Sequence, residues 1–73
     1  MKAKLEFDLP EEQVEFNLAI NAGNWSHVVW KLDQDLRGKI KYSESITEEQ
    51  RDIYQEVRNL LHEFMVEQNV DWE

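Results

Sequence analysis

The sequence predicts a small α+β domain in the order strand–helix–helix–helix–strand, with a two-stranded sheet packed on the helices. Three observations support this prediction. Apolar and polar residues alternate strictly over residues 2–9, which is typical of a strand with one buried face. Residues 25–42 and 47–68 carry apolar residues at helical spacing. Residues 69–73 alternate again and would form the second strand.

Residues 2–9 would form the first strand. Its buried side would consist of the four apolar residues of the alternation: Ala3, Leu5, Phe7 and Leu9. An isolated two-stranded ribbon is only marginally stable in water, so the helices would have to cover this side. The relative direction of the two strands stays open.

Residues 10–22 predict a short first helix. Pro10 is tolerated in a first helical turn, and the acids that follow it favour the positive end of the helix dipole. Gly23 would end the helix as its C-terminal cap. A strand paired with the first one stays open as an alternative, because four apolar residues of this stretch also alternate: Val14, Phe16, Leu18 and Ile20.

The central helix, predicted over residues 25–42, is the element around which the rest of the chain is arranged. Asn24 or Ser26 would cap it. Asp33 and Arg37 stand four residues apart in the acid-before-base order that supports a helix. Trp30 projects from the polar side, where a core position and an interface position both stay open. The core face would consist of six residues: Trp25, Val28, Val29, Leu32, Leu36 and Ile40.

The third helix would begin at Thr47, because Gln50 three residues later gives the spacing of a capping box. It would run to residue 68. Its apolar face would consist of Ile53, Val57, Leu60, Leu61 and Phe64. Arg51, Arg58 and His62 would flank this face. A stripe of acids would occupy the opposite side: Glu48, Asp52, Glu56, Glu63 and Glu67.

Length and charge limit the function. The 73 residues predict a single domain, 1–73, near the size at which one core barely suffices. Sixteen acids against eight bases give a net charge of −8, and residues 44–73 hold nine of the acids with only two bases. Direct nucleic-acid binding is disfavoured because it requires Lys and Arg to neutralise phosphates, whereas a basic protein partner is favoured. No apolar run approaches the length of a membrane span, so we expect a cytoplasmic protein.

Catalytic and metal-binding motifs are not found in the sequence. His27 and His62 have no second His or Cys at ligand spacing, and residues 62–66 depart from HExxH because Val66 replaces the second His. The serines lie outside any GxSxG motif, and there is no Gly-rich phosphate loop. We therefore expect no enzymatic activity, no metal and no cofactor.

The acidic stripe of the third helix predicts a partner-binding surface. Carboxylates four residues apart on a helix lie about 6 Å apart along its axis, comparable to phosphates along a nucleic-acid strand. Such a row fits a basic groove, although an ordinary solvated helix face is the alternative. Trp30, Gln34 and Arg37 form a second predicted contact, since Trp and Arg are enriched among interface hot spots.

Residues 28–42, VVWKLDQDLRGKIKY, follow LEFDLPEEQ at residues 5–13. These segments resemble a group of small acidic tailed-phage proteins with a pattern close to FDLPE…LWDLDQ.LR.KIKY. Lys31 and Asp35 replace the usual acid and aromatic residue of that pattern. The resemblance implies a context rather than an activity: small acidic phage proteins often bind and block a host enzyme, including restriction and CRISPR nucleases.

We therefore predict a non-enzymatic protein-binding module. Its favoured form is an acidic inhibitor or DNA mimic, of the anti-restriction or anti-CRISPR class, acting on a basic nucleic-acid-handling protein such as a nuclease in the host cytoplasm. The alternative is a self-associating structural or regulatory module. Such a homodimer would form through the strand edge or through the side that carries Phe16 and Ile20.

Overall fold

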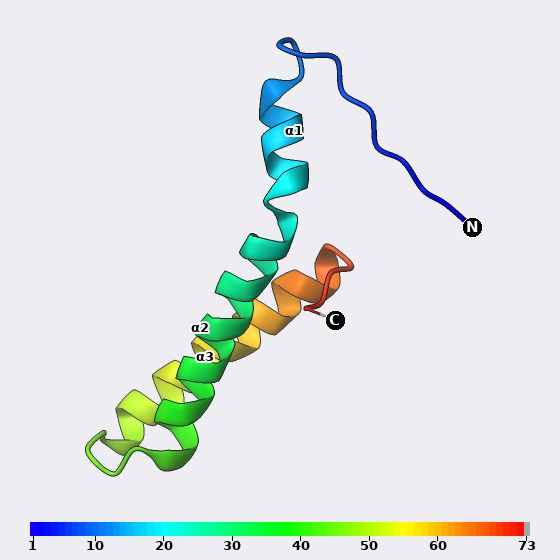
Figure 1. Cartoon of the computed structure of the whole chain (residues 1–73). Coiled ribbons are helices and arrows are strands. Elements are labelled where there is room, and N and C mark those ends of the chain that lie inside the picture. The colour runs from blue at the N-terminus through cyan, green and yellow to red at the C-terminus, as the bar shows by residue number, and fades with distance from the viewer. Residues whose placement is uncertain (73) are drawn as a thin grey trace.

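The structure, a computed structural model, describes residues 1–72 and contains three α-helices within them (Figure 1). These are α1 (Gln13–Ile20), α2 (Ala22–Tyr42) and α3 (Glu48–Glu67). Helices α2 and α3 run in opposite directions as a hairpin, and α1 extends beyond it, roughly in line with α2 (Figure 1). The described chain is elongated, with extents of 52 × 27 × 18 Å. None of its helices has the length and apolar character needed to cross a membrane.

The predicted α+β fold is wrong, because none of residues 1–72 belongs to a β-strand. Residues 1–8 have no regular secondary structure, and the segment expected to pair with them ends α3 instead. Asn69 adopts a positive φ of 54°, and the N–H groups of Asn69 and Val70 donate to the carbonyls of Val66 and Met65, each at 3.0 Å. This Schellman motif turns the chain back against α3. Residue 73, the last of the predicted second strand, lies outside the described residues.

Residues 10–22 contain a helix rather than a strand, although α1 begins later than predicted. Before it, the N–H of Asp8 donates to Glu12 Oε1 at 2.9 Å, and the N–H of Glu12 donates to the Asp8 carbonyl at 2.7 Å. The ring of Phe7 meets the ring of Phe16 edge-on, with centroids 5.8 Å apart. Of the apolar residues expected on a strand, Phe7 thus packs its ring against α1.

Gly23 does not end the first helix, contrary to the prediction. Helical hydrogen bonding continues through the junction: the N–H of Asn21 donates to the Asn17 carbonyl at 3.1 Å, and the N–H of Trp25 donates to the Asn21 carbonyl at 3.0 Å. Gly23 keeps a negative φ and lies inside α2. A glycine caps a helix by adopting positive φ, so Gly23 is not a cap. Instead α1 ends at Ile20, Asn21 is the turn residue between the helices, and α2 starts three residues before the predicted Trp25.

The predicted capping box at the start of α3 is confirmed. The Gln50 N–H donates to Thr47 Oγ1 at 3.1 Å, and the Thr47 N–H donates to Gln50 Oε1 at 2.9 Å. The connection between α2 and α3 is also fixed to α3, because Arg51 Nη2 donates a hydrogen bond to the Ser43 carbonyl at 3.0 Å. Local hydrogen bonds therefore fix the point at which α3 begins.

The buried core of the hairpin is very small. Leu36, at 6% exposure, is the one large hydrophobic residue of the described chain that is buried. Val29 and Ile40 are half-buried, as predicted for the core face. Leu32 was also expected in the core, yet it is 48% exposed, and Trp25 and Val28 are exposed too. A single neighbouring helix covers only one stripe of α2, which is narrower than the predicted apolar face.

Candidate functional site

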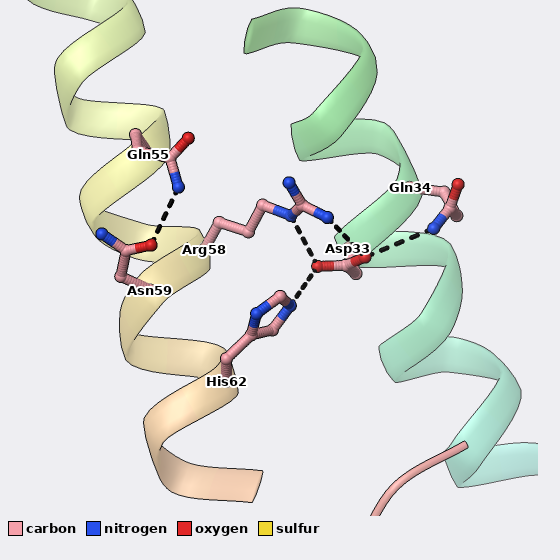
Figure 2. Close-up of polar contacts among 6 residues, drawn as sticks. All are labelled: Asp33, Gln34, Gln55, Arg58, Asn59 and His62. Carbon is pink, nitrogen blue, oxygen red and sulfur yellow. Dashed lines mark hydrogen bonds and ion pairs between the residues drawn. The ribbon is translucent and has the colours of Figure 1, made fainter. Parts of the chain in front are cut away.

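A buried ionic cluster joins α2 to α3 (Figure 2). Asp33 of α2 is only 1% exposed. Its Oδ1 accepts a hydrogen bond from Arg58 Nε at 2.8 Å and lies 2.6 Å from His62 Nε2. Its Oδ2 accepts from Arg58 Nη2 and from Gln34 Nε2, both at 3.3 Å. Donors from both helices thus surround the carboxylate, which is the condition under which a buried charge is tolerated.

The hydrogen bond from Arg58 lowers the pKa of Asp33 below its ordinary value. Burial raises this pKa but is the smaller influence, and the hydrogen bond from His62 adds to the lowering. Asp33 is therefore ionised at neutral pH. Because both of its oxygens accept hydrogen bonds from the chain itself, the cluster links the helices and leaves no carboxylate oxygen for general-base chemistry. No group of three or more His, Cys, Asp or Glu within residues 1–72 is placed to hold a metal ion.

Sequence spacing had paired Asp33 with Arg37 along the same helix, whereas the structure pairs it with α3. Two signals pointed to this arrangement. Asp33 lies between Val29 and Leu36 on the apolar face of its helix, where an unpaired acid would be costly. Arg58 and His62 stand one turn apart, so that both reach the same neighbour.

The predicted acidic stripe lies on the outer side of α3. Helical spacing of about 100° per residue turns its members away from Arg58 and His62, which face α2. Within residues 1–72, none of the five takes part in an ion pair. All five are exposed: Glu48, Asp52, Glu56, Glu63 and Glu67.

The second predicted contact, formed by Trp30, Gln34 and Arg37, lies on one side of α2. Trp30 is 41% exposed, and its ring stacks on His27 with centroids 5.8 Å apart and 19° between the planes. Gln34 and Arg37 are half-buried.

The second predicted contact and the acidic stripe lie on the same side of the hairpin. Viewed from the N-terminus of each helix, Trp30 and Gln34 lie clockwise from Asp33, and the acidic stripe lies clockwise from Arg58. Because the helices are antiparallel, the same sense of rotation places both features on one side of the hairpin, which we call the polar face.

Exposed apolar residues form two further stripes. The first, here called the α2 stripe, runs along α1 and α2 and consists of Val14, Leu18, Trp25, Val28 and Leu32. The second, the α3 stripe, consists of Ile53, Val57, Leu60 and Phe64. These four were predicted to form the core face of the third helix together with Leu61. Leu61 alone among them is half-buried, because α3 turns Arg58, Leu61 and His62 toward α2.

The two apolar stripes lie on the same side of the hairpin. Viewed from the N-terminus of its helix, each apolar stripe lies anticlockwise from the residues that face the other helix. Because the helices are antiparallel, both stripes therefore lie on the side of the hairpin opposite the polar face. A groove confirms this placement, since Leu18 and Trp25 of one stripe line it together with Phe64 of the other. We call the combined surface the apolar face. Most residues of the apolar face were predicted from the sequence to be buried in the core, and the structure shows them exposed.

Comparisons with protein-family models, with curated proteins and with solved structures find no match to this chain. Three features of the hairpin bear on its function: the buried cluster, the acidic stripe with its polar face, and the apolar face.

Proposed function

We propose that this chain is a non-enzymatic protein-binding module, an acidic inhibitor or DNA mimic that acts on a basic, nucleic-acid-handling protein. One observation carries the proposal: five exposed carboxylates share one side of α3, and none is neutralised by an ion pair within residues 1–72. Such an arrangement concentrates negative potential on one surface and steers a positively charged partner toward it.

The dimensions of the stripe suit a groove that holds nucleic acid. From Glu48 to Glu67 the helix advances about 28 Å, at about 1.5 Å per residue. One turn of B-DNA advances about 34 Å, so the stripe would occupy a little less than one turn of a duplex-binding groove. Carboxylates one helical turn apart would then meet the Lys and Arg side chains that otherwise contact phosphates.

Trp30 adds a candidate anchor on the same polar face. It is exposed enough to enter a pocket, and its stacking on His27 restricts its orientation before binding. Preorganised aromatic residues of this kind contribute most to interface affinity, whereas surrounding charges contribute more to association rate and specificity. The stripe and Trp30 would thus have different roles at one surface.

The test compares the chain with a variant that carries Asp52→Asn and Glu56→Gln. Both are immobilised and exposed to a bacterial lysate at about 50 and about 300 mM salt, since screening removes exposed charge interactions over this range. Proteins that mediate the proposed function should be retained at low salt, be released at high salt and bind the variant less. Double-stranded DNA should displace them.

The matched control is the variant Gln55→Asn, which alters a neighbouring side chain of α3 without changing the charge. It should retain the same proteins as the unmodified chain. Retention that is insensitive to salt, or a complex that holds DNA and this chain at the same time, would leave the acidic stripe as ordinary solvated surface.

A further inference from the structure

No helix of residues 1–72 covers the apolar face, and the C-terminal residues Val70, Asp71 and Trp72 line only the groove where Leu18, Trp25 and Phe64 lie. We propose that a second copy of this chain covers it, so that two hairpins associate through their apolar faces into a four-helix bundle. The inference concerns the side of the hairpin opposite the acidic stripe and does not depend on the proposed function.

One hairpin does not form a sufficient core. Leu36 is its one buried large hydrophobic residue, and the other apolar side chains of the two stripes are exposed. A chain of 73 residues is only marginally stable even when it completes a core. The contacts missing from the single chain must therefore come from outside it.

The exposed area matches what a stable dimer requires. From their fractional exposures, the residues of the two stripes expose on the order of 1,000 Å² per chain, against roughly 800 Å² per partner in a standard stable interface. Complete burial of both faces would cover on the order of 2,000 Å², the lower limit of the range of obligate homodimers. One further copy therefore has enough apolar area to cover the whole apolar face.

The charge distribution favours a second copy over the basic partner. The chain has sixteen acids, yet few lie beside the stripes: by helical spacing Asp35 borders the α2 stripe, where it pairs with Lys39, and Asp71 lines the groove between the stripes. A basic partner would find little counter-charge there, while a second copy would bring an equally apolar surface, as homodimer interfaces do. A face needed for folding also requires a partner that is present whenever the chain is made, and a second copy meets that condition.

The arrangement also gives α1 a contact that the single chain lacks. This helix has no buried residue and extends past the end of the hairpin (Figure 1). Val14 and Leu18 continue the α2 stripe along it, so the second copy can cover α1 and α2 together. The acidic stripes of both copies stay exposed, because they lie outside the covered face.

The experiment is sedimentation equilibrium of the full chain from about 1 to about 100 µM, with helix content followed by circular dichroism at the same concentrations. We expect a species of twice the 8.8 kDa chain mass and a helical signal that falls on dilution as the dimer dissociates. A helical monomer over the whole range, or an assembly larger than two chains, would overturn the proposal.

Two matched substitutions then test the face. Leu60→Glu places a charge in the middle of the α3 stripe and should raise the dimer dissociation constant at least 100-fold. Val66→Glu introduces the same charge at another exposed aliphatic of α3, one that is 79% exposed and lies off the stripe, and should change the constant less than threefold. Equal effects, or a larger effect of Val66→Glu, would show that the wrong side was assigned.

Leu60→Ala keeps the test decisive if Leu60→Glu fails to fold at any concentration. This truncation adds no charge and should weaken the dimer about tenfold, while unchanged affinity would overturn the assignment. Salt separates this inference from the proposed function. Screening reduces repulsion between two chains of charge −8, so added salt should strengthen the dimer, whereas it should weaken binding through the acidic stripe.

Discussion

The substitution Asp33→Asn tests whether the buried cluster holds α2 and α3 together. Asn has nearly the size and shape of Asp, so packing around the site is preserved. The change removes the negative charge and leaves the Arg58 guanidinium, whose Nε lies 2.8 Å from the Asp33 carboxylate, without its counter-charge. Any loss of stability therefore reports on the ion pair rather than on a cavity.

The magnitude follows from the burial of the partners. Removing one member of a fully buried ion pair costs about 3–5 kcal/mol, because the remaining charge is left uncompensated. The side chains of Arg58 and His62 are 19% and 44% exposed, so water partly compensates for the lost partner. We expect the free energy of unfolding to fall by about 2–3 kcal/mol, a large share of the total for a small domain.

The assay is urea denaturation followed by circular dichroism, at one fixed chain concentration because association makes the apparent stability depend on concentration. The control is Asp35→Asn on the same helix. Asp35 forms an ion pair with Lys39, but both side chains are exposed, so its removal should change stability little. A difference between the two variants isolates the effect of burial.

The pH dependence provides a second readout. Because the folded-state pKa of Asp33 is lowered, its stabilisation is complete above the ordinary Asp value of 3.8 and is lost as pH falls through the lower folded pKa. The stability difference between the unmodified chain and Asp33→Asn should therefore shrink on acidification below that value. Equal stabilities at neutral pH, or a difference that does not shrink in acid, would refute this account of the cluster.

Three further substitutions test other parts of the chain. Leu36→Ala should lower the free energy of unfolding by about 2–4 kcal/mol, measured by the same denaturation, because it removes the one large buried hydrophobic residue of the described chain. Thr47→Ala should cost about 1 kcal/mol through loss of the capping box, whereas Ser45→Ala in the same connection should cost less; a reversed order would contradict the capping role. Trp30→Ala should leave the melting temperature nearly unchanged but weaken binding of a captured partner by more than about 2 kcal/mol, and unfolding of the variant would instead make Trp30 part of the core.

The sequence predicted the elements that local interactions determine. The start of the third helix was correct because the Thr47 and Gln50 side chains bond to each other's backbone within one turn. The central helix was correct in type and in its end at Tyr42. The acidic stripe was also correctly placed on an exposed side, since that follows from helical spacing alone.

The parts that were wrong depend on contacts between distant segments or on a single backbone angle. The alternation over residues 2–9 is compatible with a strand, but a strand needs a partner, and Asn69 removes that partner by adopting positive φ. Gly23 permits a helix end but does not require one, because glycine adopts negative and positive φ with similar ease. The sequence therefore does not show which φ the residue adopts. Helical periodicity also cannot show how much of an apolar face one neighbouring helix covers, which is why Leu32 was placed in the core.

The Asp33 cluster has a consequence for the alignment of the two helices. Val, Leu and Ile side chains are nearly interchangeable, so two apolar helices can slide past each other by a turn with little change in contact energy. Because Arg58 and His62 stand one turn apart, a slip of one turn between α2 and α3 would leave only one of them opposite Asp33, and the buried carboxylate would lose part of its donors. The cluster therefore fixes the register of the hairpin, and with it the residues that line each face. An apolar substitution of the whole cluster could preserve stability and still allow several competing registers.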